Sequence, residues 1–125
     1  MLAGKEIVGT IAVKDLATAR KFYEGTLGLK VEDDKGTEAH SYRSGATRLI
    51  VYRSQFAGTN KATALNFMVG GDIDNLVKAL RERGVAFEHY DIPGVNWEGD
   101  LMVAGPMKAA WFKDPDGNIL CMMNG

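Results

Sequence analysis

The chain has 125 residues, of which 46% are hydrophobic and 25% are charged, and it carries a formal net charge of −1. This length and mix are typical of one globular domain and exclude a disordered chain or a coiled coil. The balanced charge and the lack of an 18-residue apolar run predict neither a nucleic-acid partner nor a membrane partner. A single cysteine excludes an internal disulfide and fits a reducing compartment, so we expect a cytoplasmic protein without a secretory leader.

The first half of the chain predicts a strand, a helix and then further strands. Large apolar residues alternate with small or polar ones over Ile7–Val13, which is typical of a half-buried strand. Asp15 stands at the N-cap position of a helix whose apolar positions run from Leu16 to Leu27, and Gly28 ends this helix. Extended structure is then expected in three segments, the last two joined by a turn at residues 44–47: Leu29–Val31, Glu38–Arg43 and Arg48–Arg53.

The second half repeats this order of elements. Ala64–Val69 alternates in the same way, and a helix capped by Asp72 or Asp74 follows it and ends at Gly84. Three more strands are expected, the last two joined by a turn over residues 114–117: Val85–Phe87, Lys108–Lys113 and Asn118–Met123. Gly28 and Gly84 are 56 residues apart, within one residue of the 57 that separate the two capping aspartates. Two independent landmarks therefore indicate the same repeat.

The repeat predicts an α+β fold, a single domain over residues 1–125 made of two βαβββ modules at about residues 5–56 and 62–124. The modules are expected to form a cupped mixed sheet around a cavity, with one helix covering one face of each. Strand residues of the opposite phase then line the cavity, which is a default ligand site. The second module also carries an insert, residues 91–106, whose glycines and prolines predict a long irregular loop.

Two motifs stand in register with this repeat. The opening motif is Val13-Lys14-Asp15-Leu16 with Phe22-Tyr23 and Leu27-Gly28-Leu29, and the closing motif is Phe112–Asn118. They resemble the V-x-D-L…FY…LGL opening and the F-x-DPDGN hairpin of the vicinal oxygen chelate superfamily, which includes glyoxalase I, extradiol dioxygenases and bleomycin-resistance proteins. The resemblance covers nearly the whole chain and implies the glyoxalase/bleomycin-resistance/dioxygenase-like fold. It also implies a homodimer, because short members of the superfamily generally pair.

In this superfamily a divalent metal ion is usually held by His, Gln or Glu side chains at four positions. Carried over by position, they fall on Val8, Ala64, Cys121 and the strand Arg48–Tyr52, none of which offers an acid or a histidine. The resemblance therefore implies a member without the usual metal ligands, and we expect no cofactor. The weak candidates for an unusual metal site are His40, His89 and Glu98, with Asp100 as a further ligand.

Side chains on the cavity phase are the candidates for ligand contact: Thr10, Tyr42, Tyr52, Asn66, Met68, Trp97 and Cys121. Trp97 is interpreted either as a lid that stacks on a bound molecule or as an anchor of the insert. The two tyrosines face either the cavity or an outer interface, and the methionines either line the cavity or fill gaps in the core. His40, as a general base, and Cys121, as a nucleophile, are the catalytic candidates, with an inert buried thiol as the alternative for Cys121.

Two classes of function remain open. The empty metal positions, the apolar cavity phase and Trp97 favour a metal-free protein that binds a small, partly apolar or aromatic molecule, as the bleomycin-resistance members do. A net charge of −1 offers little attraction for a cationic drug. The alternative is a lyase, isomerase or dioxygenase of the same superfamily that uses an atypical metal site or none, which requires convergence of His40, His89, Glu98, Asp100 and Cys121.

Overall fold

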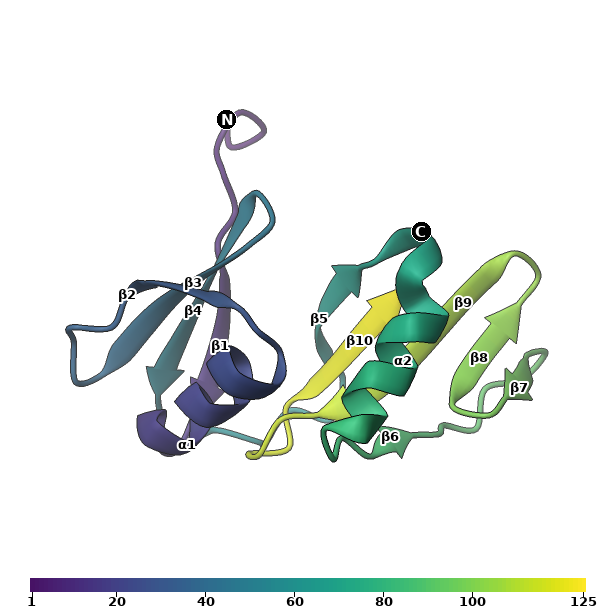
Figure 1. Cartoon of the computed structure of the whole chain (residues 1–125). Coiled ribbons are helices and arrows are strands. Elements are labelled where there is room, and N and C mark those ends of the chain that lie inside the picture. Colours follow the sequence, from purple (N-terminus) through teal and green to yellow (C-terminus); the bar gives the residue numbers. More distant parts are fainter. The chain divides into compact units, whose positions relative to one another are not determined.

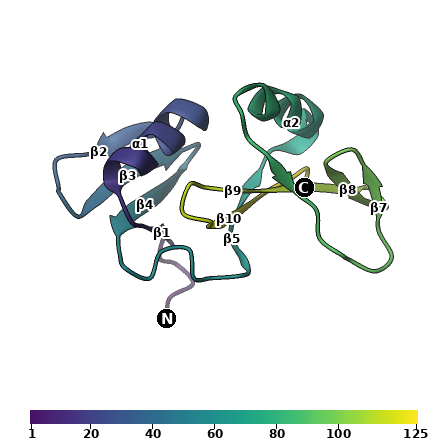
Figure 2. The same cartoon turned by 90° about the horizontal axis from the view of Figure 1, so that it is seen from below.

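The computed structural model describes residues 1–125. The chain forms two units, Met1–Gly58 and Thr59–Gly125, each of which is a β-sheet with one helical layer (Figure 1). Seen from below, each helix lies on one face of its own sheet (Figure 2). These elements confirm the predicted α+β class. None of the helices is both long enough and apolar enough to cross a membrane.

The first unit contains a four-stranded sheet in the order β1-β4-β3-β2. β1 (Gly9–Val13) runs parallel to β4 (Thr47–Arg53), whereas β3 (Ala39–Ser44) and β2 (Lys30–Asp33) are added antiparallel. Gly45, at φ +57°, lies in the β3–β4 turn in a backbone conformation that favours glycine. All strands predicted for this half are present, and their ends differ from the prediction by at most two residues.

The helical layer of the first unit differs from the predicted single α-helix. Asp15 caps α1 (Leu16–Arg20), and its carboxylate accepts a hydrogen bond from Thr18 Oγ1 at 2.7 Å. The chain then widens into a π-helix, η1 (Lys21–Thr26), whose backbone N–H groups reach five residues back. Gly25 lies inside this segment, and because glycine is a poor former of α-helical turns, the wider turn is less disfavoured here.

The covered face of the first sheet forms the core of this unit. Alternate residues of β1, β3 and β4 are buried beneath the helical layer: Ile11, Val13, His40, Tyr42, Leu49 and Val51. Tyr23 of η1 is fully buried and stacks on Tyr42, with ring centroids 6.4 Å apart. The sequence alone predicts that Tyr42 faces the cavity or an outer interface. The structure corrects this, because the β3–β4 register places Tyr42 beside Leu49 on the covered face.

The second unit contains a six-stranded sheet. β5 (Thr63–Met68) runs parallel to β10 (Ile119–Met123), and β9 (Met107–Lys113) pairs antiparallel with the other edge of β10. The short 3₁₀ turn η2 (Gly70–Asp72) leads into the helix α2 (Ile73–Glu82). Asp72 occupies the N-cap position of α2, as one of the two predicted alternatives, but its side chain makes no capping hydrogen bond.

The insert predicted as a long irregular loop, residues 91–106, contains two strands instead. β7 (Asn96–Glu98) and β8 (Leu101–Ala104) form a hairpin, and β8 pairs with the start of β9. β6 (Phe87–Glu88) pairs with the far end of the same β9 edge, because β10 occupies the opposite edge. The edge strand that corresponds to β2 is therefore split into β6 and β8, with the insert between them. Long-range pairing with β9 orders this segment despite its glycines and prolines.

The covered face of the second sheet meets α2. The buried side chains on the two sides are Ile73, Val77, Leu80, Ala110, Phe112, Leu120 and Met122. Phe112 lies opposite Leu120 in the β9–β10 register and meets the ring of Phe87 edge to face, with centroids 5.8 Å apart. Lys108 Nζ lies 3.4 Å from Asp74 Oδ2, which connects β9 to α2. The other face of this sheet carries no helix (Figure 2).

Candidate functional site

Each sheet turns one face away from its helix, and these two open faces carry most of the predicted contact residues. On the first sheet, Thr10 is exposed and Tyr52 is 40% exposed. On the second sheet, Asn66 and Met68 are exposed, and Cys121 lies beside Asn66 in the β5–β10 register. Thr10, Asn66, Met68 and Cys121 have the strand phase that the sequence predicts, away from the helix, although Cys121 is only 1% exposed. Tyr52 lies on the open face, which is one of its two predicted alternatives.

His40 and Tyr42 lie on the covered face of the first sheet instead. Tyr42 Oη donates a hydrogen bond to Glu24 Oε2 at 2.9 Å, and burial together with this bond holds the pKa of Tyr42 well above its ordinary value. His40 is buried, its ring meets that of Tyr42 edge to face at 6.4 Å, and its Nδ1 has no hydrogen-bond partner. Both are core residues of the first unit, so the structure does not bring His40 to the open face.

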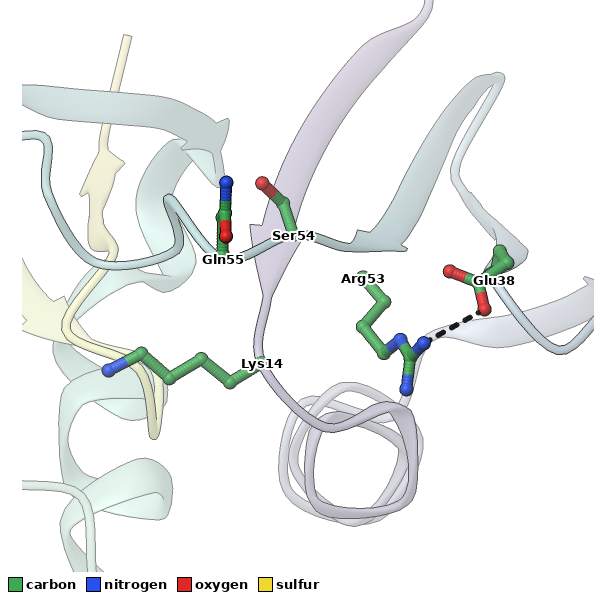
Figure 3. Close-up of a pocket in the computed structure, with 5 residues that line it drawn as sticks. All are labelled: Lys14, Glu38, Arg53, Ser54 and Gln55. Carbon is green, nitrogen blue, oxygen red and sulfur yellow. Dashed lines mark ion pairs between the residues drawn. The ribbon is translucent and has the colours of Figure 1, made fainter.

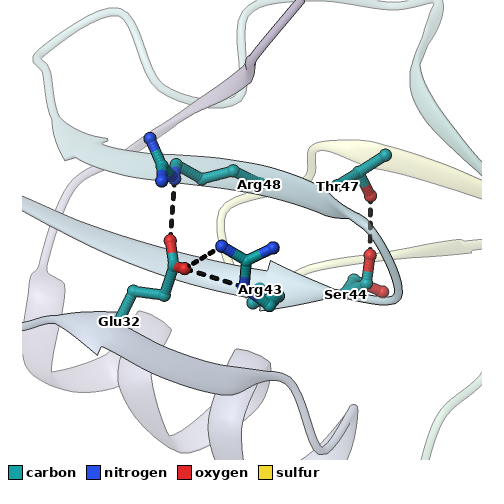
Figure 4. A network of polar contacts seen from close by, with 5 residues as sticks. All are labelled: Glu32, Arg43, Ser44, Thr47 and Arg48. Carbon is teal, nitrogen blue, oxygen red and sulfur yellow. Dashed lines mark hydrogen bonds and ion pairs between the residues drawn. The ribbon is translucent and has the colours of Figure 1, made fainter. Parts of the chain in front are cut away.

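A charged cluster that sequence reasoning missed lies on the open face of the first sheet (Figure 4). Glu32 accepts a hydrogen bond from Arg48 Nε on one carboxylate oxygen and from Arg43 Nε on the other, each at 2.7 Å. These bonds lower the pKa of Glu32. Arg43 and Arg48 are opposite each other in the β3–β4 register, so the carboxylate offsets the repulsion between two like charges. The sequence signal is the equal spacing of the two arginines about the turn, whereas only the fold adds Glu32.

An aromatic cluster covers the open face of the second sheet. Its buried centre is formed by Cys121, Met102 and Ala109, which are at most 3% exposed. Half-buried side chains pack around this centre: Ile92, Val95, Trp97, Ala104, Met107, Trp111 and Met123. Trp97 stands on β7 opposite Met102, and its ring centroid lies 6.3 Å from that of Trp111. This position on a paired strand corrects the prediction that Trp97 lies on an irregular loop.

Tyr90, which sequence reasoning also missed, adds a third ring to the aromatic cluster. It meets Trp111 edge to face, with centroids 5.6 Å apart. Its Oη is shielded from solvent and has no hydrogen-bond partner. Burial, followed by the nearby charge of Glu88, raises the pKa of Tyr90. An unpaired buried hydroxyl of this kind costs about 1–3 kcal/mol.

His89 and Asp100 form a hydrogen-bonded pair beside the aromatic cluster. His89 Nε2 lies 2.8 Å from Asp100 Oδ1, and Arg81 Nη2 donates to Asp100 Oδ2 at 2.5 Å. The contacts from Arg81 and His89 lower the pKa of Asp100. The imidazole ring stacks on Trp97, with centroids 4.4 Å apart and planes 8° from parallel. Glu98 is exposed and has the opposite strand phase to Trp97, so the structure brings Asp100 to His89 without bringing Glu98.

A polar cleft opens at one end of the first sheet (Figure 3). It has a volume of about 400 Å³ and is lined by Lys14, Glu38, Arg53, Ser54 and Gln55. Lys14 follows the last residue of β1, and Arg53 is the last residue of β4, so the polar cleft lies outside the carboxyl ends of two parallel strands. None of these residues was predicted as a site residue, because each is an ordinary polar residue at or beside the end of a strand.

The chain is an α+β protein built from two βαβββ units. Each unit has a helix on one face of its sheet and an open face on the other. The chain belongs to the glyoxalase/bleomycin resistance protein/dioxygenase superfamily, whose family model matches residues 7–122. This match confirms the family and the fold that the two sequence motifs indicate. A comparison with curated proteins gives no match.

Solved structures of low sequence identity share the fold. Lactoylglutathione lyase from Agrobacterium tumefaciens superimposes with a TM-score of 0.73 at 15% identity, over 98% of this chain and 95% of that one. A glyoxalase/bleomycin resistance protein/dioxygenase from Alicyclobacillus acidocaldarius superimposes with a TM-score of 0.71 at 20% identity, over 96% of this chain and 90% of that one. The fosfomycin resistance protein FosX from Mesorhizobium loti superimposes with a TM-score of 0.69 at 13% identity, over 100% of this chain and 94% of that one. These likenesses establish the fold alone.

The positions that usually hold metal ligands in this superfamily carry unsuitable side chains. Val8 and Ala64 end in hydrocarbon, and β4 offers no carboxylate or imidazole. Cys121 is a single thiol that is 1% exposed, and burial raises its pKa to about 11. No three His, Cys, Asp or Glu side chains are grouped so that they could hold a metal ion. The residues present do not fit a divalent metal ion, and we assign no step to one.

The thiol of Cys121 is expected to resist alkylation in the folded protein. It is 1% exposed and its pKa is raised to about 11, whereas an ordinary thiol has a pKa of about 8.5. Because only the thiolate reacts, iodoacetamide at pH 7.5 should modify the folded chain at least about 100-fold more slowly than the urea-unfolded chain. The rate should rise with pH toward pH 11. Mass spectrometry of timed samples measures both rates, and equal rates at pH 7.5 would contradict the buried thiol.

Proposed function

We propose that the protein binds a small, partly aromatic molecule against the aromatic cluster of the second sheet, without using a metal ion. The observation that carries this proposal is the packing of Trp97 and Trp111 around a buried centre that contains Cys121 and Met102. The indole rings offer a broad, polarizable contact area to a flat apolar ring. The side chains packed around this centre are mostly apolar, which is typical of the lining of small-molecule sites.

The titratable groups of the aromatic cluster support binding more than covalent chemistry. A nucleophilic cysteine needs a lowered pKa or an adjacent base, but burial raises the pKa of Cys121 to about 11. The pKa of Tyr90 is raised as well. A side chain that stays protonated at neutral pH makes contacts without attacking a bound molecule. In line with the family resemblance, the proposal includes a homodimer that acts in the cytoplasm.

A titration with 2-acetylnaphthalene, a flat aromatic ketone, tests the proposal. We expect saturable quenching of tryptophan fluorescence in the wild-type chain, which has two tryptophans. Trp97→Ala is expected to weaken binding about tenfold, because loss of one stacked ring removes on the order of 1 kcal/mol. Trp111 remains as the reporter in that variant. Trp97→Phe, which keeps an aromatic ring, should retain most of the affinity.

Phe56→Ala is the matched control, since Phe56 is an aromatic residue of the first unit that is 68% exposed. Its removal should leave the affinity for 2-acetylnaphthalene unchanged, and far-UV circular dichroism checks that each variant is folded. Wild-type protein that shows no saturable quenching would contradict the proposed function. Equal affinity of Trp97→Ala and wild type would contradict the role of Trp97.

One contact favours a second function, a lyase or isomerase that uses no metal. An imidazole held by a carboxylate is the arrangement of a general base, and His89 has this relation to Asp100 at 2.8 Å while it stacks on Trp97. The same ketone tests this candidate, since a base beside it would exchange the protons of its methyl group. Deuterium uptake from D₂O that is lost in His89→Gln would support the enzyme, whereas binding without uptake would support the binding protein.

A further inference from the structure

We propose that the protonation state of His89 controls the affinity of the aromatic cluster for its ligand, through the stack of His89 on Trp97. This inference rests on the proposed function and names a regulator of the same site. All the residues involved belong to the second unit of the chain, so the inference depends on no contact between the two units. Binding is expected to tighten as the pH falls through the range in which histidine gains a proton.

Trp97 depends on side-chain contacts for its position. It lies at the centre of β7, which is only three residues long and forms an edge of the second sheet (Figure 1). β7 pairs with β8 alone, so few backbone hydrogen bonds hold it. The imidazole ring of His89 lies within 8° of parallel to the indole ring of Trp97, with centroids 4.4 Å apart. His89 therefore packs against one face of the Trp97 ring and limits its movement.

Two polar contacts connect His89 to α2. His89 Nε2 lies 2.8 Å from Asp100 Oδ1, and Arg81 Nη2 of α2 donates to Asp100 Oδ2 at 2.5 Å. The contacts from Arg81 and His89 lower the pKa of Asp100, so its carboxylate is ionised near neutral pH and only accepts hydrogen bonds. Nε2 of His89 therefore carries a hydrogen atom, and the additional proton binds at Nδ1. The side chain of His89 is 48% exposed, which leaves it open to protons from solvent.

The other carboxylates close to His89 in the chain are directed elsewhere. Glu88 Oε1 lies 3.2 Å from Lys113 Nζ, and Glu98 has the opposite strand phase to Trp97. Asp100 is the carboxylate that meets His89, and Arg81 is the cation that shares this carboxylate. With neutral His89, the charges of Arg81 and Asp100 add to zero. Protonation of His89 changes the total charge of the three side chains to +1.

Protonation strengthens both contacts of His89. The hydrogen bond from an imidazolium ring to a carboxylate is charge-assisted. A cation over the face of an indole ring is attracted by the negative charge of that face. Both changes hold Trp97 more firmly on its short edge strand. Because a ligand then has less ordering of Trp97 to bring about, we expect it to bind more tightly.

The first test is the tryptophan emission of the full-length protein, measured without ligand at about pH 8 and about pH 5.5. A protonated imidazole ring quenches the emission of an indole ring that it contacts, so wild-type emission should fall at the lower pH. His89→Phe keeps an aromatic ring beside Trp97 but takes up no proton, and its emission should not change. His89→Gln, which keeps a hydrogen-bond donor for Asp100, should give the same result. Far-UV circular dichroism at both pH values checks that each variant is folded.

His40→Phe is the matched control, because His40 is the other histidine of the chain. His40 is buried in the core of the first unit, and its Nδ1 has no hydrogen-bond partner there to lose. The emission of this variant should respond to pH as the wild type does.

The second test is the dissociation constant of 2-acetylnaphthalene at the same two pH values. Wild type and His40→Phe should bind about threefold more tightly at the lower pH, whereas His89→Phe and His89→Gln should bind equally at both. Equal or weaker binding of the wild type at the lower pH would overturn the inference and leave the proposed function intact. A pH dependence that persists in both His89 variants would also overturn it. Absence of binding at both pH values would instead contradict the proposed function itself.

Discussion

Replacement of Phe112 by alanine is expected to lower the free energy of unfolding by about 3–5 kcal/mol. Phe112 is 1% exposed on β9, lies opposite Leu120 of β10 and meets the ring of Phe87 edge to face at 5.8 Å. Truncation removes the apolar ring from the core and leaves a cavity, which the paired strands around it cannot close. Urea denaturation followed by far-UV circular dichroism measures the change as a lower transition midpoint.

Phe56→Ala is the control for this substitution, because the same side chain is removed from an exposed site. The free energy of unfolding should change by no more than about 0.5 kcal/mol, as is usual for surface substitutions. A loss in Phe56→Ala that matches the loss in Phe112→Ala would show that burial does not determine the effect. A small loss in Phe112→Ala would contradict the core described for the second unit.

Asp114→Ala is expected to lower the free energy of unfolding by about 3 kcal/mol. Asp114 is 4% exposed, and its carboxylate accepts hydrogen bonds from Asn118 N–H and Asn118 Nδ2, both at 2.8 Å, and from Asp116 N–H at 2.9 Å. These bonds close the turn between β9 and β10. Alanine leaves three donors without their acceptor, and the Asn118 donors are buried, so water cannot replace the carboxylate there.

Asp33→Ala is the matched control for Asp114→Ala. Asp33 Oδ1 also accepts a hydrogen bond from a backbone N–H two residues ahead, that of Lys35 at 3.1 Å, but this turn is exposed. Water can satisfy the released donor, so we expect a loss below about 0.5 kcal/mol. Both variants are measured by urea denaturation. An equal loss in the two variants would contradict the role of burial in the Asp114 turn.

Several parts of the fold were predictable because their signals are local. Alternation with a period of two marks β1, β4 and β5 and separates the covered residues Ile11 and Val13 from Thr10 on the open face. Asp15 caps α1 by a bond to its own first turn. The turn that contains Asp114 closes through contacts between residues at most four apart. Such features depend on a few neighbouring residues, so the sequence alone indicates them.

The prediction for Tyr42 and the prediction for the insert were wrong for the same physical reason. Alternation shows that Tyr42 and its neighbours face opposite ways, but only pairing with β4 and burial under Tyr23 decide which way Tyr42 faces. The insert has glycines and prolines that are typical of a loop, and pairing with β9 orders part of it as β7 and β8. Pairing between segments far apart in the chain outweighs local preference in both places.

For the candidate sites, the sequence by itself determined the strand phase of Thr10, Asn66 and Cys121, because alternation with a period of two is a local property of the sequence. Only the tertiary structure decided which of the remaining polar residues meet. His89 reaches Asp100 across 11 positions, and the polar cleft joins residues from the ends of β1 and β4. These contacts are between segments that are separate in the chain, and no local pattern encodes the register that brings them together.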